Sequence, residues 1–183
     1  MAQEFLPDTG DASPWGKTPW FGRAILRHVV FGEAFPTINS SLYFALYSAN
    51  PCDLGNNSDT GITSGDAEAN YAGYARVAVV RNNTNFTNTG LAGTTSLALM
   101  PDVVFPACLD SNADILPYIG ICAGPNTSDP ILWYALVGIG TASTTEGPLL
   151  SDPFVTGLND EPVLGGYNSS SGGTVSFSFV GGG

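Results

Sequence analysis

The sequence predicts a mainly β protein: a single β-sandwich or jelly-roll-like domain with one N-terminal helix and an extended N-terminal arm. After about residue 40, short apolar runs alternate with period two, which is typical of strands. Turns rich in Gly, Pro and Asn separate these runs, and the chain holds 23 Gly and 13 Pro. Its 183 residues suit one domain with a core of its own.

The predicted organisation has three parts: an arm at 1–18, a helix at 19–32, and a β domain at 33–183 with long loops at 50–70 and 138–173. Prolines and glycines between positions 7 and 16 prevent a long helix or strand in the arm. The arm nevertheless carries Phe5, Leu6 and Trp15. Two interpretations are open: a disordered end with incidental aromatic residues, or an arm that packs along a neighbouring subunit.

One helix is predicted from its ends. Thr18 suits the N-cap, Pro19 the first helical position and Gly32 the C-terminal cap. Between them an apolar stripe recurs at helical spacing, formed by Phe21, Ile25, Leu26, Val29 and Val30. Arg23 and Arg27 share another face, which is either solvated or in contact with an anionic neighbouring subunit.

Six segments are predicted as strands, with the following ranges: 42–47, 74–80, 103–105, 118–122, 131–136 and 174–180. The first places Leu42, Phe44 and Leu46 on one face, and the last alternates in the same way. No repeat of 20–50 residues occurs, and 138–173 is rich in Gly, Ser, Thr and Pro. Many short strands after one helix favour a sandwich or jelly roll.

The charge is strongly acidic and unevenly distributed. Sixteen acidic residues face five basic ones, giving a net charge of -11, and no Lys or Arg follows Arg81. This balance argues against a nucleic-acid partner, which needs clustered cations, and against anionic membrane surfaces. An acidic surface can simply resist aggregation. Alternatively, the basic N-terminal third docks on something acidic.

Cysteine usage and the N-terminus indicate the compartment. The three cysteines form no C-x-x-C pair, so neither a disulfide framework nor a zinc site is expected. The first residues lack the cationic and apolar regions of a signal peptide, and no run of about 18 apolar residues occurs. We therefore expect synthesis in a host cytoplasm and no membrane partner.

Catalytic chemistry finds little support in the sequence. His28 is the only histidine and Lys17 the only lysine, and no nucleophile motif accompanies either. A pair of carboxylates could still form a hydrolase site, but most of the acids stand in turn contexts. The acid-rich segment 53–66 matches no calcium-loop pattern. We expect no enzyme, no cofactor and no metal.

Aromatic residues are the remaining candidates for binding. Three tryptophans permit a sugar-stacking platform, and therefore a carbohydrate-binding β-sandwich as an alternative function. Trp133 lies in an apolar run and is expected in the core. Trp15 and Trp20 flank the junction of arm and helix, and we expect them in subunit contacts because Trp is enriched at interfaces.

Read in order, several motifs resemble those of a family of small virion proteins of tailed bacteriophages, commonly labelled tail fibre proteins and sometimes found as head decoration. The motifs span about 150 residues: 25–32 ending in Gly, S-L-Y-F-A-L-Y at 41–47, N-P at 50–51, Y-A-R at 74–76, F-P at 105–106, I-G-I at 119–121, I-L-W-Y at 131–134, and the closing strand at 174–179. The arm and the longer segment 138–173 depart from the family pattern.

The resemblance implies a non-enzymatic virion structural protein, with a capsid decoration (cement) subunit on the head exterior as the first expectation. Its partners would be the major capsid protein or other virion proteins, and it would form a homo-oligomer, with a trimer preferred. The expected contact residues are Phe5, Leu6, Trp15, Lys17, Trp20, Arg23 and Arg27. A tail fibre, baseplate or receptor-binding position is the alternative, with exposed loop contacts at Tyr71, Tyr118 and Tyr167.

Overall fold

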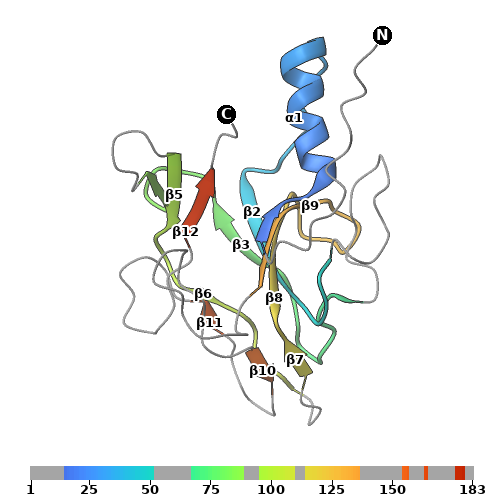
Figure 1. Ribbon diagram of the computed structural model, residues 1–183. Coiled ribbons are helices and arrows are strands. Elements are labelled where there is room, and N and C mark those ends of the chain that lie inside the picture. Colours follow the sequence, from blue (N-terminus) through green and yellow to red (C-terminus); the bar gives the residue numbers. More distant parts are fainter. Residues whose placement is uncertain are drawn as a thin grey trace.

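The computed structural model describes residues 15–51, 67–88, 95–109, 114–136, 154–156, 163–164 and 176–179 (Figure 1). The elements are β1 (Trp15–Lys17), α1 (Pro19–Phe31), β2 (Ser41–Tyr47), β3 (Val77–Val80), β4 (Phe86–Asn88), β5 (Thr95–Leu99), β6 (Val103–Val104), β7 (Asp114–Leu116), β8 (Tyr118–Cys122), β9 (Ile131–Leu136), β10 (Phe154–Thr156), β11 (Val163–Leu164) and β12 (Ser176–Phe179). The prediction of a mainly β chain with a single helix is confirmed for these ranges.

The largest sheet is antiparallel and has five strands in the order β1-β9-β8-β2-β3. Its central pairing sets Phe44 opposite Ile121 and Leu46 opposite Ile119. Between β8 and β9 the register shifts, because Ile121 faces Trp133 whereas Cys122 faces Ile131. The extra residue, Leu132, lies in a β-bulge, which increases the local twist where β9 approaches α1.

Smaller antiparallel sheets complete the described strands. One has the order β12-β5-β4, and the strand pairs β11-β6 and β10-β7 form the others. β10 and β11 lie in the segment 138–173, which the sequence predicted as loops. Strands of two or three residues carry too few alternating positions to be recognised from periodicity.

The core lies against both faces of the central strands. On one face, Phe44 and Leu46 are fully buried in a cluster that also contains Leu99 of β5, Val103 of β6, Leu116 of β7 and Leu164 of β11. This confirms the predicted inward face of β2. The opposite face is also covered, by a second cluster that includes Ala45, Tyr47, Cys122 and Ile131.

The ends of α1 are formed as predicted. The Thr18 hydroxyl accepts a hydrogen bond from the Phe21 amide at 3.3 Å and donates one to the Ile131 carbonyl at 2.7 Å. Pro19 opens the helix, and Gly32 closes it in the left-handed conformation with a φ of 67°. Because Thr18 also bonds β9, the cap fixes the base of the helix on the sheet.

Two predicted boundaries differ from the structure. Trp15–Lys17, expected in the arm, form the edge strand β1 instead, with Trp15 opposite Ala135 and Lys17 opposite Trp133. The free edge of β9 offers unpaired backbone groups that this short segment satisfies. The second predicted strand begins only at Val77. Tyr74, where it was expected to begin, closes a turn instead, because its amide donates a hydrogen bond to the Tyr71 carbonyl at 3.0 Å.

Candidate functional site

The helix α1 stands away from the sheet instead of lying on it (Figure 1). Its base is packed: the Phe21 ring lies 4.5 Å from the Trp133 ring and 5.9 Å from the Phe35 ring. Trp20 and Ile25 are partly buried in the same cluster. Beyond Ile25 the predicted apolar stripe loses contact with the core, because the helix continues past the edge of the sheet.

The free part of α1 exposes large apolar side chains. Leu26 is 54% exposed, Val29 73%, Val30 65% and Phe31 72%. Burying such a side chain is worth about 1.5–3 kcal/mol, and contiguous apolar patches on a protein surface commonly mark interaction sites. We call these four residues, together with Arg23 and Arg27, the α1 surface.

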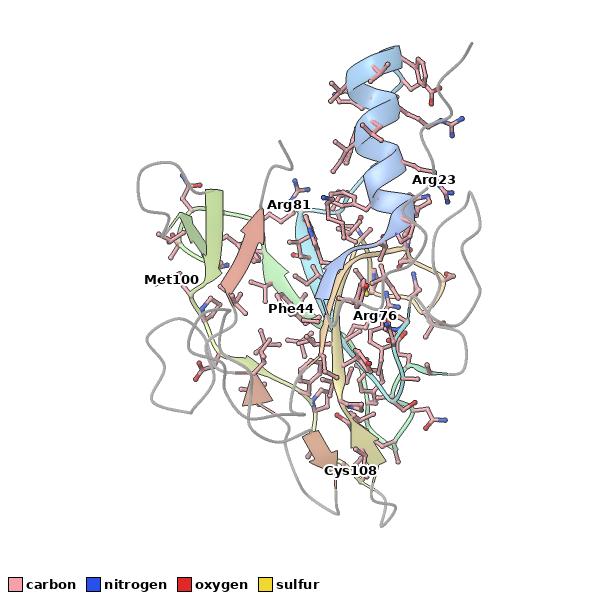
Figure 2. The ribbon with its side chains drawn as sticks, in the orientation of Figure 1. Arg23, Phe44, Arg76, Arg81, Met100 and Cys108 are labelled. Atoms are coloured by element: carbon pink, nitrogen blue, oxygen red, sulfur yellow. The ribbon has the colours of Figure 1, made fainter. Side chains whose placement is uncertain are left out.

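The charge of the α1 surface is positive. The helix contains no acidic residue, and Arg23 and Arg27 stand on it at a spacing of one turn. Figure 2 shows Arg23 on the helix. Arg27 Nε lies 3.3 Å from Glu33 Oε2, in an ion pair whose side chains are 59% and 49% exposed. Lys17, at the end of β1, is exposed as well. An apolar surface with basic residues fits an acidic partner that also carries apolar side chains.

A cavity of about 440 Å³ lies beside the base of α1. Its lining is mostly apolar, with Phe21, Phe35, Ile38, Leu42, Phe86, Ile121, Leu132 and Trp133, and with Arg81, Asn82 and Asn83 as its polar part. The Arg81 guanidinium donates to the Asn39 carbonyl at 3.1 Å, which holds this side chain at the rim. The cavity therefore lies at the packed base of α1, and none of the residues of the α1 surface lines it.

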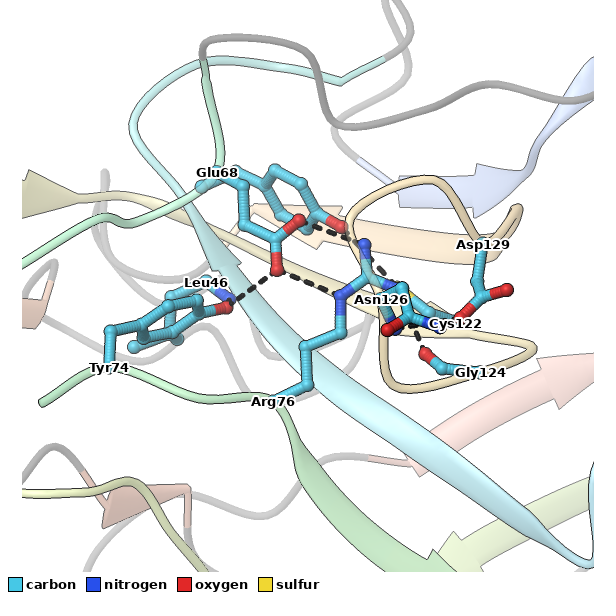
Figure 3. A network of polar contacts seen from close by, with 9 residues as sticks. Leu46, Glu68, Tyr74, Arg76, Cys122, Gly124, Asn126 and Asp129 are labelled. Carbon is cyan, nitrogen blue, oxygen red and sulfur yellow. Dashed lines mark hydrogen bonds and ion pairs between the residues drawn. The ribbon is translucent and has the colours of Figure 1, made fainter.

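A second candidate site is a buried polar network beside β2 (Figure 3). Arg76 donates to Glu68 through Nε and Nη2, both at 2.8 Å, and the two side chains are 1% and 3% exposed. Arg76 Nη1 donates to the Gly124 carbonyl at 2.9 Å. This bidentate geometry provides charge-assisted hydrogen bonds that offset the loss of solvation of both ions.

Two tyrosines extend the network. The Tyr74 hydroxyl donates to Glu68 Oε1 at 3.0 Å and accepts from the Leu46 amide at 3.1 Å, while the Tyr47 hydroxyl and Cys122 Sγ lie 3.3 Å apart. Burial raises the pKa of both hydroxyls above the usual value. In the described part of the chain, every buried side-chain polar atom has a hydrogen-bond partner. The network therefore holds the segment 67–76 on the sheet.

The Cys122 thiol of this network is buried. Burial raises the pKa of the Cys122 thiol to about 11, so the reactive thiolate is disfavoured at neutral pH. For Arg76, burial lowers the pKa, but the hydrogen bonds to Glu68 and the nearby groups outweigh it and the net shift is upward. Among the described residues, no three His, Cys, Asp or Glu side chains group closely enough to hold a metal ion.

The structure brings several predicted contact residues together. Lys17, Trp20, Arg23 and Arg27 all lie on or beside α1. Trp15 lies in β1, and its side chain is outside the description. Phe5, Leu6 and Tyr167 lie outside the described residues.

The predicted exposure of Tyr71 is wrong. It is 3% exposed, and its hydroxyl donates to the Pro106 carbonyl at 2.9 Å. Burial raises the pKa of this hydroxyl to about 12. The reason is local: the chain returns to the sheet at Ala69, whose amide bonds the Leu46 carbonyl at 2.9 Å, before Tyr71 is reached. Tyr118 is half-buried at the start of β8.

Sequence reasoning missed the Glu68–Arg76 pair. A signal was present, because Arg76 is a basic residue at the head of an otherwise apolar run, and arginine is almost never fully buried without a partner. The partner itself had no signal, since Glu68 falls in a segment predicted as a polar loop.

No protein-family model matches the chain, and no curated protein matches it significantly. Within the described ranges, no helix has the length and apolar character needed to cross a bilayer.

Proposed function

We propose that this chain is a non-enzymatic structural protein of a tailed-phage virion, bound as a homo-oligomer to the head exterior as a decoration subunit. The observation that carries the proposal is the α1 surface, a projecting helix end that is apolar, free of acids and basic on one side. The motif order of the chain supplies the phage context.

A decoration subunit needs a contact surface more than it needs a reactive site. It stabilises a shell by adding buried interface that exists only in the assembled state, so its effect follows mass action. A helix that stands off its own sheet can reach a neighbouring protein without moving the core. The exposed Leu26, Val29, Val30 and Phe31 provide apolar area, and Arg23 and Arg27 favour an acidic neighbour.

The proposed domain is a two-layer sandwich. Supporting it, the five-stranded sheet packs through Phe44, Leu46 and Ile121 onto apolar residues of β5, β6, β7 and β11. In a virion this layered domain would face solvent, with α1 directed at the neighbouring protein.

A tail or baseplate position that recognises host glycans is the second candidate, and it has less support. It calls for exposed aromatic residues at loop tips, and Tyr71 is buried. The N-terminal contact residues are compatible with either position, so localisation must decide between them.

The test is localisation on purified virions by immunogold labelling and cryo-electron microscopy, with copy number from gel densitometry. Hundreds of copies spread over the head are expected, and a few copies confined to the tail would contradict the proposal. Binding of the purified chain to heads that lack it then tests the surface. Val29→Ser with Val30→Ser should reduce binding at least tenfold, whereas Val80→Ser, at another exposed valine, should leave it unchanged.

A further inference from the structure

We infer that the α1 surface is covered by the N-terminal segment, residues 1–14, of a second copy of this chain. The inference rests on the proposed function in one respect, that the subunit acts as a homo-oligomer, and it names the partner of that same surface.

The charges of the two partners are complementary. Residues 1–14 contain three acids and no Lys or Arg, whereas residues 15–31 contain three basic residues and no acid. The acids are Glu4, Asp8 and Asp11, and the basic residues are Lys17, Arg23 and Arg27. Such opposite patches favour association and fix its register. The exposed Arg27–Glu33 pair is no obstacle, because exposed pairs are easily exchanged for others.

The apolar residues match in the same way. In the segment, Phe5 and Leu6 stand between Glu4 and Asp8. On the helix, Leu26 and Val29 are three positions apart on one face, beside the face of the arginines. If an extended segment packs Phe5 and Leu6 against the apolar face, the flanking Glu4 and Asp8 come close to the arginines on the neighbouring face.

Chain direction favours a second copy over the same chain. β1 pairs with β9, and Lys17 at its end is followed by Thr18, the N-cap of α1. The chain therefore runs toward the helix along β1. Residues before Trp15 enter β1 from its far end. To reach Val29 of its own chain, Phe5 would have to reverse direction before β1 and then pass β1 and most of the helix, a path of roughly 25 Å. The chain from Phe5 to Trp15 spans at most about 33 Å, so the same chain makes this contact only with the segment almost fully extended after its reversal. A segment from a second copy is not tied to this end of β1.

Each copy offers one helix and donates one segment, so the contact is able to close into a symmetric pair or a ring. The α1 surface then contacts a neighbouring subunit, and substitutions at Val29 and Val30 weaken head binding because they separate the subunits that bind the head together. This would link neighbouring decoration subunits to one another around the shell.

The first test measures self-association of the full chain by sedimentation and light scattering. We expect an oligomer whose dissociation constant rises at least tenfold for Arg23→Glu with Arg27→Glu, and equally on deletion of residues 2–12. Adding Glu4→Arg and Asp8→Arg to the double arginine variant should restore association. A matched control, Val80→Ser, should not change it. Unchanged association in both the charge-reversed and the deleted variants would overturn the inference.

The second test traps the contact as a disulfide. In a Cys52→Ser background, Phe5→Cys with Val30→Cys should oxidise to species of two or more chains on a non-reducing gel, and Phe5→Cys with Val80→Cys should not. Cys108 and Cys122 are buried thiols that are not in a disulfide, so they should not interfere. A cross-link within one chain, or none, would overturn the choice of a second copy.

The two proposals fail separately. If the chain associates through α1 but is absent from virion heads, the proposed function fails and the α1 contact stands. If the chain decorates heads while its association ignores the variants, the α1 contact fails and the proposed function stands.

Discussion

Two arginine–glutamate pairs in this chain differ in almost everything but their chemistry. Arg76 and Glu68 are buried and joined by two hydrogen bonds of 2.8 Å, whereas Arg27 and Glu33 are about half exposed and meet at 3.3 Å. The first pair is connected to β2 through Tyr74, and the second pair lies at the end of α1. The comparison separates what holds the fold together from what the molecule presents to partners.

Burial determines the role of each pair. The Glu68 and Arg76 side chains are almost fully shielded from water, so the pair stabilises the fold only if protein groups satisfy their oxygens and nitrogens. The Tyr74 hydroxyl and the Gly124 carbonyl provide the remaining hydrogen bonds. Arg27 keeps its hydration and loses little if its partner changes. Arg27 can therefore exchange Glu33 for a carboxylate of another protein at little cost in stability.

The largest effect is expected from breaking the buried pair. Glu68→Gln removes the negative charge but leaves the buried Arg76 guanidinium without a counter-ion. We expect a loss of about 3–5 kcal/mol in the free energy of unfolding, measured by urea denaturation. Glu68→Leu combined with Arg76→Met removes both charges and should be clearly more stable than Glu68→Gln. If Glu68→Gln unfolds at the same urea concentration as the parent chain, the pair does not hold the fold.

The packing around the network gives the second prediction, because two glycines can be compared directly. A methyl group at Gly120 would lie 2.6 Å from Cε2 of the Tyr47 ring, whereas at Gly22 in α1 nothing lies within 4 Å. Gly120→Ala should cost about 1–3 kcal/mol of stability through overpacking. Gly22→Ala should instead stabilise the chain by up to about 1 kcal/mol through higher helix propensity. Equal effects at the two sites, measured by thermal unfolding, would argue against this difference in packing.

The third prediction concerns alkaline pH. Burial raises the pKa of Cys122 from 9.0 to about 11. Between these values the unfolded chain has released this proton and the folded chain keeps it, so stability is present below pH 9 and falls as the pH rises toward 11. The slope from this thiol is at most about 1.4 kcal/mol per pH unit. Urea midpoints under reducing conditions at pH 8 and pH 10 should differ less in Cys122→Ala than in the parent chain, while Val29→Ser should keep the parental difference.

Sequence patterns predicted the elements whose signals are local. The caps of α1 at Thr18, Pro19 and Gly32 depend on single residue types at adjacent positions, and β8 and β9 have the predicted ends. β12 occupies the middle of its predicted range, and its side chains lie outside the description. Apart from β5 (Thr95–Leu99), which was also missed, the strands missed are short ones such as β10 and β11, which are defined by their partners more than by their own residues.

The candidate site was predictable only in part. Basic residues near the N-terminus predicted a docking region, and the structure places Lys17, Arg23 and Arg27 on or beside α1. Docking at these residues stays a prediction. However, periodicity describes which residues share a helix face and does not say whether the protein covers that face. The exposure of Val29 depends on where the sheet ends, which is a tertiary property. The same limit applies to Glu68, whose partner lies eight positions away across a turn.

The smallest effect is expected at the exposed pair, and it is the most informative about α1. Arg27→Gln removes the ion pair with Glu33 and should change the free energy of unfolding by less than about 1 kcal/mol. If the α1 surface binds an acidic partner, the same substitution should weaken self-association or head binding severalfold, and more at low than at high salt. A variant that is as stable as the parent and yet binds less would place Arg27 in an interface. A large loss of stability would instead assign Arg27 to the fold, and the contrast between the two pairs would disappear.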